Sequence, residues 1–400
     1  MSKVLGIIAE YDPFHNGHAY MVKEAINCVS DVYDCTPDDV IRIAAISGDF
    51  TQRGEPALID KWSRAEMAMR QGFDLVVGMP VVFCCNNAGY FAKAGVEILE
   101  SLGAEVIAFG SETTHLQTLL NAASRRASIT EEQQEMIKSM VKEGKSYPAA
   151  LSEVLGEEVQ FGPNDSLGIE YIRHMKKAAP IPVKRRGAEH DSGEAFGPIA
   201  SASFIRRRLL DGEPLEAVSE LIPSTTMDVL KRESEAQGFC SPDMLFKLIA
   251  SKVASSSDDE LNAVYGAEEG LGSKLKDEFR YAAGWDGLLW ALKSKRYTMT
   301  RVQRVLIHML TNLTKDMVHE AKPYVRILAF NARGAAHLKS LKRSDALTLT
   351  LIENIKTDLK EHPDLRSTFE MDILSADLYN IALGRDLYTN SEYVKKPLIF

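Results

Sequence analysis

The first two hundred residues alternate short apolar runs with longer segments of helical periodicity. The apolar runs are nearly continuous and bounded by turn residues, which is typical of buried strands; they cover residues 4–8, 41–46, 75–79, 106–109 and 181–184. Between them, helical spacing of apolar positions covers residues 18–29, 61–71, 91–102, 114–143 and 166–177. This order predicts a Rossmann-like α/β fold whose parallel sheet is covered by helices on both faces. Ligands of such sheets bind at the carboxyl ends of the strands.

The alternation of strands and helices fades near residue 200. The following residues read as largely helical, with one further short strand predicted at residues 324–330. Gly212 and Pro214 mark the change. We therefore expect an α/β domain at residues 1–215, followed by a mainly helical domain at residues 216–400.

The distribution of charge along the chain indicates a contact with a polyanion. The 400 residues are 45% hydrophobic and 26% charged, with a net charge of −9, which is typical of a globular chain and argues against coating of nucleic acid by the whole surface. Residues 293–343, however, hold twelve Lys and Arg against two acidic residues. A basic segment on an acidic body predicts a localised contact with a polyanion.

The hydropathy pattern predicts neither a membrane span nor a signal peptide. The longest apolar run, residues 75–85, is interrupted by Gly78 and Pro80, whereas a span requires about twenty apolar residues. Near the start of the chain, Glu10 appears before an adequate signal-peptide core has accumulated. We therefore expect a cytoplasmic protein.

The first predicted strand runs into the sequence EYDPFHNGH, and a helix begins there. Gly17 permits close approach of the backbone, and a helix start offers free N–H groups and the positive end of a dipole. His15 and His18 are three residues apart, so both imidazoles can point at one phosphate group. HxGH after the first strand is typical of adenylyl-transferring enzymes and is similar to the HIGH motif of class I aminoacyl-tRNA synthetases. The alternatives are a metal pair or two ordinary histidines at a helix start.

Cations gather after the second predicted strand. Arg53 lies in a polar loop, and Lys61 and Arg64 open the next helix on one face. Because cations at a helix start oppose the dipole, local stability does not explain them, whereas an anionic ligand does. The alternative is that they are solvated surface charges.

Three weaker motifs follow later strands. Gly110 permits a base or ribose to pack on the backbone, although a tight turn requires a glycine equally. Asn164 or Asp165 is either the N-cap of a helix or, for Asn164, a reader of adenine or phosphate. The helix start from Ser201 to Arg206 resembles the IS(S/A)TxIR element of nucleotidyltransferases, which holds the β- and γ-phosphates.

A basic helix is predicted after residue 297. At about 100° per residue, Tyr297, Arg301, Arg304 and His308 fall within an arc of about 60° beside an apolar face. Arginine binds phosphate and tyrosine stacks on unpaired bases, which favours RNA as the partner over a solvated basic face. The residues expected to contact RNA are Lys295, Arg296, Tyr297, Arg301 and Arg304.

Seven segments in order, from Gly6 to about Arg304, resemble the bacterial tRNA(Met) cytidine acetate ligase family. They are GIIAEYDPFHNGH, SGDFTQRGEPALIDKW, FGSE, GPNDSLGIEYI, KRRGAEHD, IASASFIR and SKRYTMTRVQR. The resemblance implies a nucleotidylyltransferase-like, ATP-binding catalytic domain before a helical tRNA-binding domain. It also implies an enzyme that activates acetate with ATP and acetylates the wobble cytidine of elongator tRNA(Met), giving N4-acetylcytidine.

The resemblance also implies site residues. Contacts with ATP carry over to Ile7, Ile8, Ala9, Glu10, Tyr11, Asp12, Pro13, Phe14, His15, Asn16, Gly17, His18, Ala19, Tyr20, Gly110, Asn164 and Arg185, and we add Ser201 and Arg206. Arg186 is the alternative to Arg185. We expect His15, His18 and Lys61 to be catalytic and Arg53 and Arg64 to bind substrate. Mg²⁺ is expected with ATP, and Asp12 departs from the family's asparagine.

Two other functions remain open from the sequence. A small-metabolite adenylyltransferase of the pantetheine-phosphate or nicotinate-mononucleotide type would explain the first half of the chain and leave the basic half idle. A non-enzymatic RNA-binding protein that kept an old nucleotide fold is the third possibility. The sequence does not indicate an oligomeric state.

Overall fold

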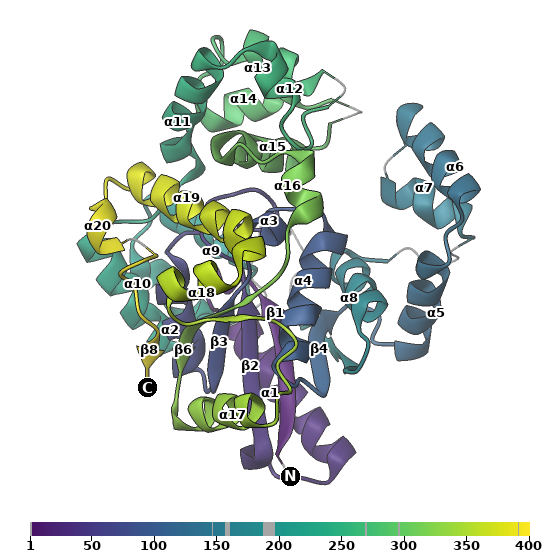
Figure 1. Cartoon of the computed structure of the whole chain (residues 1–400), viewed down its shortest axis with the longest axis vertical. Coiled ribbons are helices and arrows are strands. Elements are labelled where there is room, and N and C mark those ends of the chain that lie inside the picture. Colours follow the sequence, from purple (N-terminus) through teal and green to yellow (C-terminus); the bar gives the residue numbers. More distant parts are fainter. Residues whose placement is uncertain are drawn as a thin grey trace.

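A mostly parallel sheet forms the centre of the molecule (Figure 1). The computed structural model describes residues 2–145, 147–156, 161–186, 197–268, 270–294, 297–390 and 392–400. Its strands are β1 (Lys3–Ala9), β2 (Val40–Ile46), β3 (Leu75–Gly78), β4 (Val106–Ser111), β5 (Ala179–Lys184), β6 (Val325–Phe330), β7 (Leu351–Ile352) and β8 (Leu398–Ile399). They follow the order β5-β4-β1-β2-β3-β6-β7, with β8 beside β6. The first five strands are parallel, as predicted, and β6 runs antiparallel to β3.

Helices cover both faces of this sheet, which explains why the central strands are almost entirely apolar. One face packs against α1 (Asn16–Tyr33), α2 (Lys61–Arg70), α9 (Ala202–Leu210) and α10 (Ser224–Ala236). The other face packs against α4 (Ala88–Ser101), α5 (Leu116–Ala127), α8 (Pro163–His174) and α17 (Ala332–Arg343). The Rossmann-like α/β class predicted from the strand rhythm is therefore confirmed.

The second half of the chain contributes strands as well as helices. β6, β7 and β8 all lie beyond residue 216 and extend the sheet past β3. A boundary at 215/216 therefore does not separate the sheet from the helices, because the mainly helical second part adds strands to the sheet. The apolar run at 324–330 was recognised as a strand, but its partner β3 lies some 250 residues away in sequence, as the pairing of Leu75 with Phe330 shows. β6 covers what would otherwise be an exposed edge.

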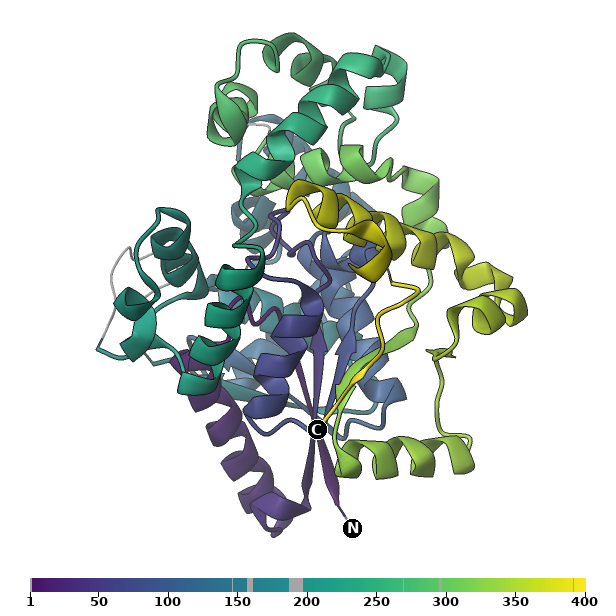
Figure 2. The same ribbon diagram turned by 90° about the vertical axis from the view of Figure 1, so that its left-hand side faces the viewer.

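A helical lobe stands above the carboxyl edge of the sheet (Figure 1). It contains α11 (Pro242–Ser255), α12 (Asp258–Asn262), α13 (Leu271–Glu278), α14 (Gly284–Leu292), α15 (Met299–Thr311) and α16 (Lys315–Glu320) around its own apolar core. Figure 2 shows α19 (Arg366–Ala382) crossing between this lobe and the sheet. The remaining helices are α3 (Val81–Cys84), α6 (Glu131–Lys142), α7 (Tyr147–Val154), α18 (Ile355–Glu361) and α20 (Leu387–Asn390).

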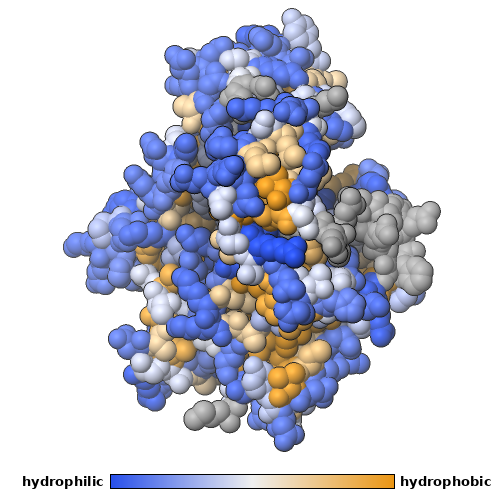
Figure 3. All heavy atoms as spheres, turned by 90° about the vertical axis from the view of Figure 1, so that its right-hand side faces the viewer, coloured by the Kyte–Doolittle hydropathy of each residue, from blue (hydrophilic) through white to orange (hydrophobic). Residues whose placement is uncertain are grey.

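The surface is mostly hydrophilic on the face shown in Figure 3. Hydrophobic residues gather there in patches along the middle, below the helical lobe, and hydrophilic residues surround them. None of the helices in the described ranges has the length and apolar character that a membrane crossing demands.

Candidate active site

The loops that follow β1, β2 and β4 meet at the edge of the sheet that faces the helical lobe (Figure 1), and Arg185 directly follows β5 at the same edge. Parallel strands place their carboxyl ends at one edge, and this edge is where such sheets bind ligands. The polar clusters predicted after successive strands are thus brought together by the topology.

A pair of stacked imidazoles occupies the loop after β1. The chain turns through Tyr11, whose φ is 50°, and α1 then begins with His15 as its N-cap. The His15 and His18 rings stack with centroids 3.7 Å apart and planes inclined by 24°. The Tyr11 ring meets the His18 ring edge-on at 5.1 Å. Aromatic packing therefore holds both imidazoles in one fixed position.

Both imidazoles are neutral. The backbone N–H of His15 donates to Nδ1 of His18 at 3.3 Å, so the ring proton of His18 is on Nε2. Nδ1 of His15 is buried and has no hydrogen-bond partner among the described residues. Burial, with Arg185 and Arg206 nearby, lowers the pKa of His15 to about 3, and burial together with His15 and Arg185 also lowers the pKa of His18. The pair can donate hydrogen bonds at pH 7 without carrying charge.

Most other side chains of residues 7–20 belong to the core or to its edge. Those of Ile7, Ile8, Tyr11, Asp12, Pro13 and Phe14 are buried, and those of Ala9, Glu10, Ala19 and Tyr20 are half-buried. The Asn16 amide donates to the carbonyl oxygens of Pro198 and Glu220, at 3.0 and 2.8 Å. A Cβ on Gly17 would lie 2.9 Å from the His15 ring. A ligand at this loop would therefore meet its backbone and the imidazoles rather than its apolar side chains.

A second set of polar residues lies after β4 and β5. The Asn164 amide donates to Oε1 of Glu112 at 2.5 Å, and its oxygen accepts from Arg185 at 3.0 Å. A Cβ on Gly110 would lie 3.4 Å from Cγ of Arg185, so the arginine stem passes close to that backbone. Gly110, Asn164 and Arg185, predicted separately from the sequence, are thus neighbours.

Asp165 supports this second set, and its role was not predicted. Its carboxylate accepts from Oγ of Ser111 at 2.5 Å and from the N–H groups of Glu112 and Thr113 at 2.9 and 3.1 Å. The N-cap of α8 is Gly162, so neither Asn164 nor Asp165 caps the helix. Asp165 instead ties the start of α8 to the end of β4.

The structure distinguishes Arg185 from its neighbour. Arg186 places its guanidinium 4.7 Å from the centre of the Tyr20 ring. Arg185 lies near the imidazoles, where its charge contributes to the lowered pKa values of His15 and His18. This geometry favours Arg185 as the residue that faces a nucleotide.

The start of α9 brings Ser201 and Arg206 to the same edge. Oγ of Ser201 accepts from the N–H of Phe204 at 3.2 Å as the N-cap. Arg206 donates to the carbonyl oxygen of Asp12 at 2.8 Å and to Oε2 of Glu55 at 3.3 Å. Its Nε lies 3.6 Å from Oδ2 of Asp12, a buried atom without a hydrogen bond among the described residues.

Two predicted functional cations of the β2–α2 loop and helix are structural. Arg64 is completely buried, and its guanidinium donates to carbonyl oxygens of Glu10, Ser47, Gly48 and Ile59 and to the Ser47 hydroxyl. The prediction that Arg64 binds substrate is wrong, because its donors join the ends of β1 and β2.

Lys61 is also buried and paired. Its ammonium lies 2.6 Å from Glu392 and 3.6 Å from Asp49. Burial alone would lower the pKa of Lys61, but these two carboxylates raise it. Both carboxylates hold its charge within the protein, so a catalytic role would require Lys61 to leave them. Arg53, on the same loop, is half-buried.

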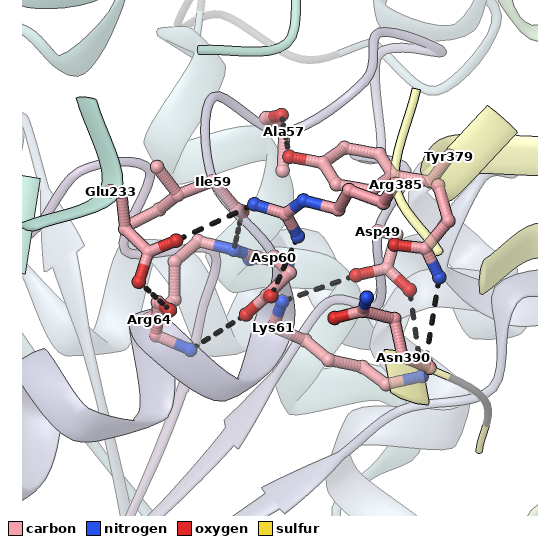
Figure 4. Close-up of polar contacts among 12 residues, drawn as sticks. Asp49, Ala57, Ile59, Asp60, Lys61, Arg64, Glu233, Tyr379, Arg385 and Asn390 are labelled. Carbon is pink, nitrogen blue, oxygen red and sulfur yellow. Dashed lines mark hydrogen bonds and ion pairs between the residues drawn. The ribbon is translucent and has the colours of Figure 1, made fainter. Parts of the chain in front are cut away.

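Figure 4 shows the ion-pair cluster around Lys61. Arg385 bonds to Asp60 at 2.9 Å and to Glu233 at 3.4 Å, while the Tyr379 hydroxyl donates to the carbonyl of Ala57 at 2.9 Å. We define the Lys61 cluster as Asp49, Asp60, Lys61, Glu233, Arg385 and Glu392. It joins the end of the β2–α2 loop to the last sixteen residues of the chain, a pairing across 325 positions that no sequence spacing indicates.

The predicted basic face of α15 is less exposed than expected. Tyr297 is 6% exposed and cannot offer an open ring to a base, so that prediction is wrong. His308 is buried, and its ring nitrogens contact the carbonyl oxygens of Tyr265 and Cys85 at 2.8 and 2.7 Å. Arg301 and Arg304 remain half-buried. Lys295 and Arg296 lie outside the described residues.

α15 contacts the β2–α2 loop directly. The Gln303 amide donates to Oε1 of Glu55 at 2.9 Å, and Arg304 donates to the carbonyl of Gln52 at 3.5 Å. The N–H of Gln52 in turn donates to Oε1 of Glu10 at 2.7 Å. Sequence reasoning missed Glu55 and Gln303, because nothing in their own segments indicates the contact.

Metal-binding side chains do not gather at this edge. Within the described ranges, no three His, Cys, Asp or Glu side chains are placed to hold one ion together. The arrangement instead offers imidazole and guanidinium donors, which suit the oxygens of a phosphate chain.

Comparison with known proteins agrees with this geometry. A model of the family described as HIGH Nucleotidyl Transferase matches residues 2–393. The tRNA(Met) cytidine acetate ligase of Caldicellulosiruptor saccharolyticus is 33% identical over 99% of this chain and 98% of its own length. That of Bacillus licheniformis is 33% identical over 99% and 97%.

Two solved structures share the whole fold. The crystal structure of Thermotoga maritima TmcAL without ligand has a TM-score of 0.88 and 28% identity, covering 100% of this chain and 99% of its own. The structure of the same protein bound with alpha-thio ATP has a TM-score of 0.86 and 26% identity, with the same coverage. By its residues, its fold and its full-length relatives, the chain belongs to the HIGH nucleotidyl transferases and, among them, to the tRNA(Met) cytidine acetate ligase family.

Proposed function

We propose that this protein joins acetate to the N4 amine of the wobble cytidine of elongator tRNA(Met), at the expense of ATP. The observation that carries the proposal is the stacked, neutral pair of His15 and His18, with the buried Nδ1 of His15 lacking a partner among the described residues. A stacked pair of imidazoles at a helix start, with one buried ring nitrogen left without a partner among the described residues, is suited to bind a phosphate oxygen. Family membership supplies the substrates, and a tRNA substrate implies work in the cytoplasm.

In the first step, an acetate oxygen attacks the α-phosphorus of ATP and the bond to pyrophosphate breaks, leaving acetyl-adenylate. His15 and His18 would donate hydrogen bonds to phosphate oxygens on which charge grows. Such donors, fixed before the reaction, each contribute about 3 kcal/mol to stabilising a transition state. Neutral imidazoles suffice, since they serve as donors and need not transfer a proton.

Arginines from two elements would hold the rest of the nucleotide. Arg185 lies beside Asn164 and Gly110, where ribose or base can pack on the backbone. Arg206, at the start of α9 with Ser201, would exchange its contacts with Asp12 and Glu55 for the β- and γ-phosphates. Two carboxylate partners keep its guanidinium in place until the nucleotide arrives.

Magnesium would enter with ATP. Mg²⁺ at such sites usually takes one or two carboxylate oxygens and completes its shell with phosphate and water. Oδ2 of Asp12 is buried, lacks a hydrogen bond among the described residues, and fits one such position. When bound, the ion would neutralise charge on the departing pyrophosphate.

In the second step, the N4 amine of cytidine attacks the acetyl carbonyl, a C–N bond forms, and AMP leaves. The amine lone pair is delocalised into the ring, so an activated mixed anhydride is required. The base must also be splayed out of its stack, which a single-stranded anticodon loop permits. Arg301 of α15, half-buried above this edge, would contact the RNA backbone.

Acetate-dependent exchange of labelled pyrophosphate into ATP tests the first step, and mass spectrometry of tRNA(Met) nucleosides after incubation with labelled acetate tests the second. We expect exchange to require acetate and N4-acetylcytidine to appear only with ATP. Exchange that requires a phosphorylated metabolite instead would overturn the proposal in favour of a small-metabolite adenylyltransferase. Full tRNA acetylation by a variant lacking both His15 and His18 would refute the role of these histidines on which the proposal rests.

A further inference from the structure

Arg304 is a buried cation with unused hydrogen-bond donors. Its guanidinium is half-buried, and the hydrogen bond it makes among the described residues is a long one, 3.5 Å to the carbonyl of Gln52. No carboxylate in the described ranges lies within ion-pair distance of it; its charged and polar neighbours are Cys85, Tyr265 and Arg301. Burial lowers its pKa, yet a guanidinium stays protonated in proteins. A desolvated charge in this position requires an acceptor from a ligand.

The backbone that carries Arg304 packs directly against the β2–α2 loop. A Cβ at Gly54, whose φ is 84°, would lie 2.3 Å from the backbone nitrogen of Arg304, so the two segments touch without space for a side chain. The preceding residue, Gln303, is held by Glu55, and one turn later His308 bridges two backbone carbonyls. The guanidinium is therefore presented from a rigid support, as a specific recognition contact requires.

Arg304 also lies close to the site of chemistry. It is joined through Gln52 to Glu10, which directly follows β1 and begins the loop that carries His15. Tyr265 lies beside it and is half-buried, with Tyr90 nearby. A half-buried cation and a half-buried aromatic ring thus lie next to each other, and the cation contacts the loop after β2.

The chemistry of the pyrimidine ring identifies a ligand for this pair. Cytosine carries two adjacent acceptors, O2 and N3, and a guanidinium presents two parallel N–H donors. Uracil carries a proton on N3, so the same fork would meet a donor there. When O2 and N3 are held in this way, the N4 amine stays free to face an acyl group.

We propose that Arg304 recognises the cytosine that is to be acetylated by donating to its O2 and N3, with the ring of Tyr265 beside the base. This assignment rests on the proposed function, because it names the base-reading residue of that reaction. It differs from a backbone contact, in which any cation would serve and in which the identity of the base would be irrelevant.

Variants R304Q and R304K test the assignment, with R280Q as the matched control. Arg280 is exposed in the same helical lobe and bonds to the Lys276 carbonyl, so its loss removes an equal charge away from the proposed site. Acetate-dependent pyrophosphate exchange without tRNA reports the first step. Single-turnover acetylation of tRNA(Met) transcripts reports the second, and competition by a transcript with uridine at the wobble position reports base discrimination.

We expect R304Q and R304K to retain exchange and to acetylate tRNA about 100-fold more slowly at saturating tRNA. Wild-type enzyme should bind the cytidine transcript at least tenfold more tightly than the uridine transcript, as expected for one bidentate pair, and both variants should lose this preference. Full rescue by R304K, or an effect confined to KM and shared by R280Q, would show a charge contact and overturn the assignment. Loss of exchange in R304Q would place Arg304 in the first step and also overturn it. Absence of exchange in the wild-type enzyme would instead refute the proposed function.

Discussion

Two polar clusters lie on either side of the β2–α2 loop, and they differ in how their hydrogen bonds are used. In the Lys61 cluster, each charge faces an opposite charge from another part of the chain. In the histidine loop, residues 10–18, the Tyr11 hydroxyl and Nδ1 of His15 are buried without hydrogen-bond partners among the described residues, and Oδ2 of Asp12 faces only Arg206, at 3.6 Å. Folded proteins leave few such groups unpaired, and a ligand, an ion or an ordered water is what usually completes them.

The difference shows what separates a structural charge from a functional one. Lys61 and Arg64 were predicted as ligand-binding because cations at a helix start oppose the dipole. The structure satisfies them internally, with carboxylates for Lys61 and backbone carbonyls for Arg64. Arg304 has the same charge and comparable surroundings, but its partner is a single distant carbonyl. Arg304 therefore keeps donors available to a substrate, which the charge of an arginine does not by itself reveal.

The largest effect that would test this comparison is a loss of stability on removing Arg64. Arg64→Met leaves several buried carbonyl oxygens at the ends of β1 and β2 without donors, and loss of a buried hydrogen-bonded charge costs about 4 kcal/mol. The free energy of unfolding in urea should fall by that amount. Arg70→Met, on the same helix, removes a partly exposed arginine paired with Glu66 and should cost less than about 1 kcal/mol.

Equal and small effects for Arg64→Met and Arg70→Met would contradict a structural role for Arg64. A stable Arg64→Met variant that had lost only substrate binding would support the prediction that Arg64 binds substrate.

The next effect concerns the histidine loop and should be catalytic. His15→Ala removes a preorganised donor and should lower kcat for acetate-dependent exchange about 100-fold, equivalent to about 3 kcal/mol of transition-state stabilisation. The KM for acetate should change little, because the lost hydrogen bond strengthens only as charge develops. Both constants are measured by pyrophosphate exchange at saturating ATP. His362→Ala serves as the control, because His362 is exposed.

The sequence predicted the sheet, and it placed the two histidines together after the first strand, because both depend on local pattern. Buried parallel strands are apolar along their whole length, and HxGH follows the first strand directly, so neither requires a distant partner. Residues 4–8 and 41–46, for example, lie within β1 and β2 as observed.

What the sequence did not reveal depends on pairing across the whole chain. Arg385 with Asp60, Glu392 with Lys61, and Gln303 with Glu55 each join segments hundreds of residues apart. A single sequence holds no signal for such pairs, so a charged residue that will be satisfied in the fold looks the same as one left for a ligand. The burial of Tyr297 escaped prediction for the same reason, since its helix packs on elements from both halves.

A smaller effect should appear in the dependence of stability on pH. Burial lowers the pKa of His15 to about 3 in the folded protein, whereas an unfolded histidine titrates near 6.5. The unfolded chain binds the additional proton, so stability is lost as pH falls from 6.5 towards 3, by about 2 kcal/mol between pH 6.5 and 5 for this residue. The free energy of unfolding in urea, measured at pH 7, 6 and 5, should fall more steeply with falling pH for the wild-type protein than for His15→Ala. Parallel curves would mean that His15 is not kept neutral by its surroundings.

The smallest effect distinguishes two adjacent arginines. Arg185 contacts Asn164 and lies near the imidazoles, while Arg186 lies over the ring of Tyr20. Loss of one charge-assisted hydrogen bond to a nucleotide costs about 1.5 kcal/mol, so Arg185→Ala should raise the KM for ATP in the exchange reaction about tenfold. Arg186→Ala removes the same charge one residue further along and should raise it less than about threefold. The opposite ranking would show that the nucleotide lies beside Arg186 and Tyr20, away from the stacked imidazoles, and would argue against a role of His15 and His18 in the first step.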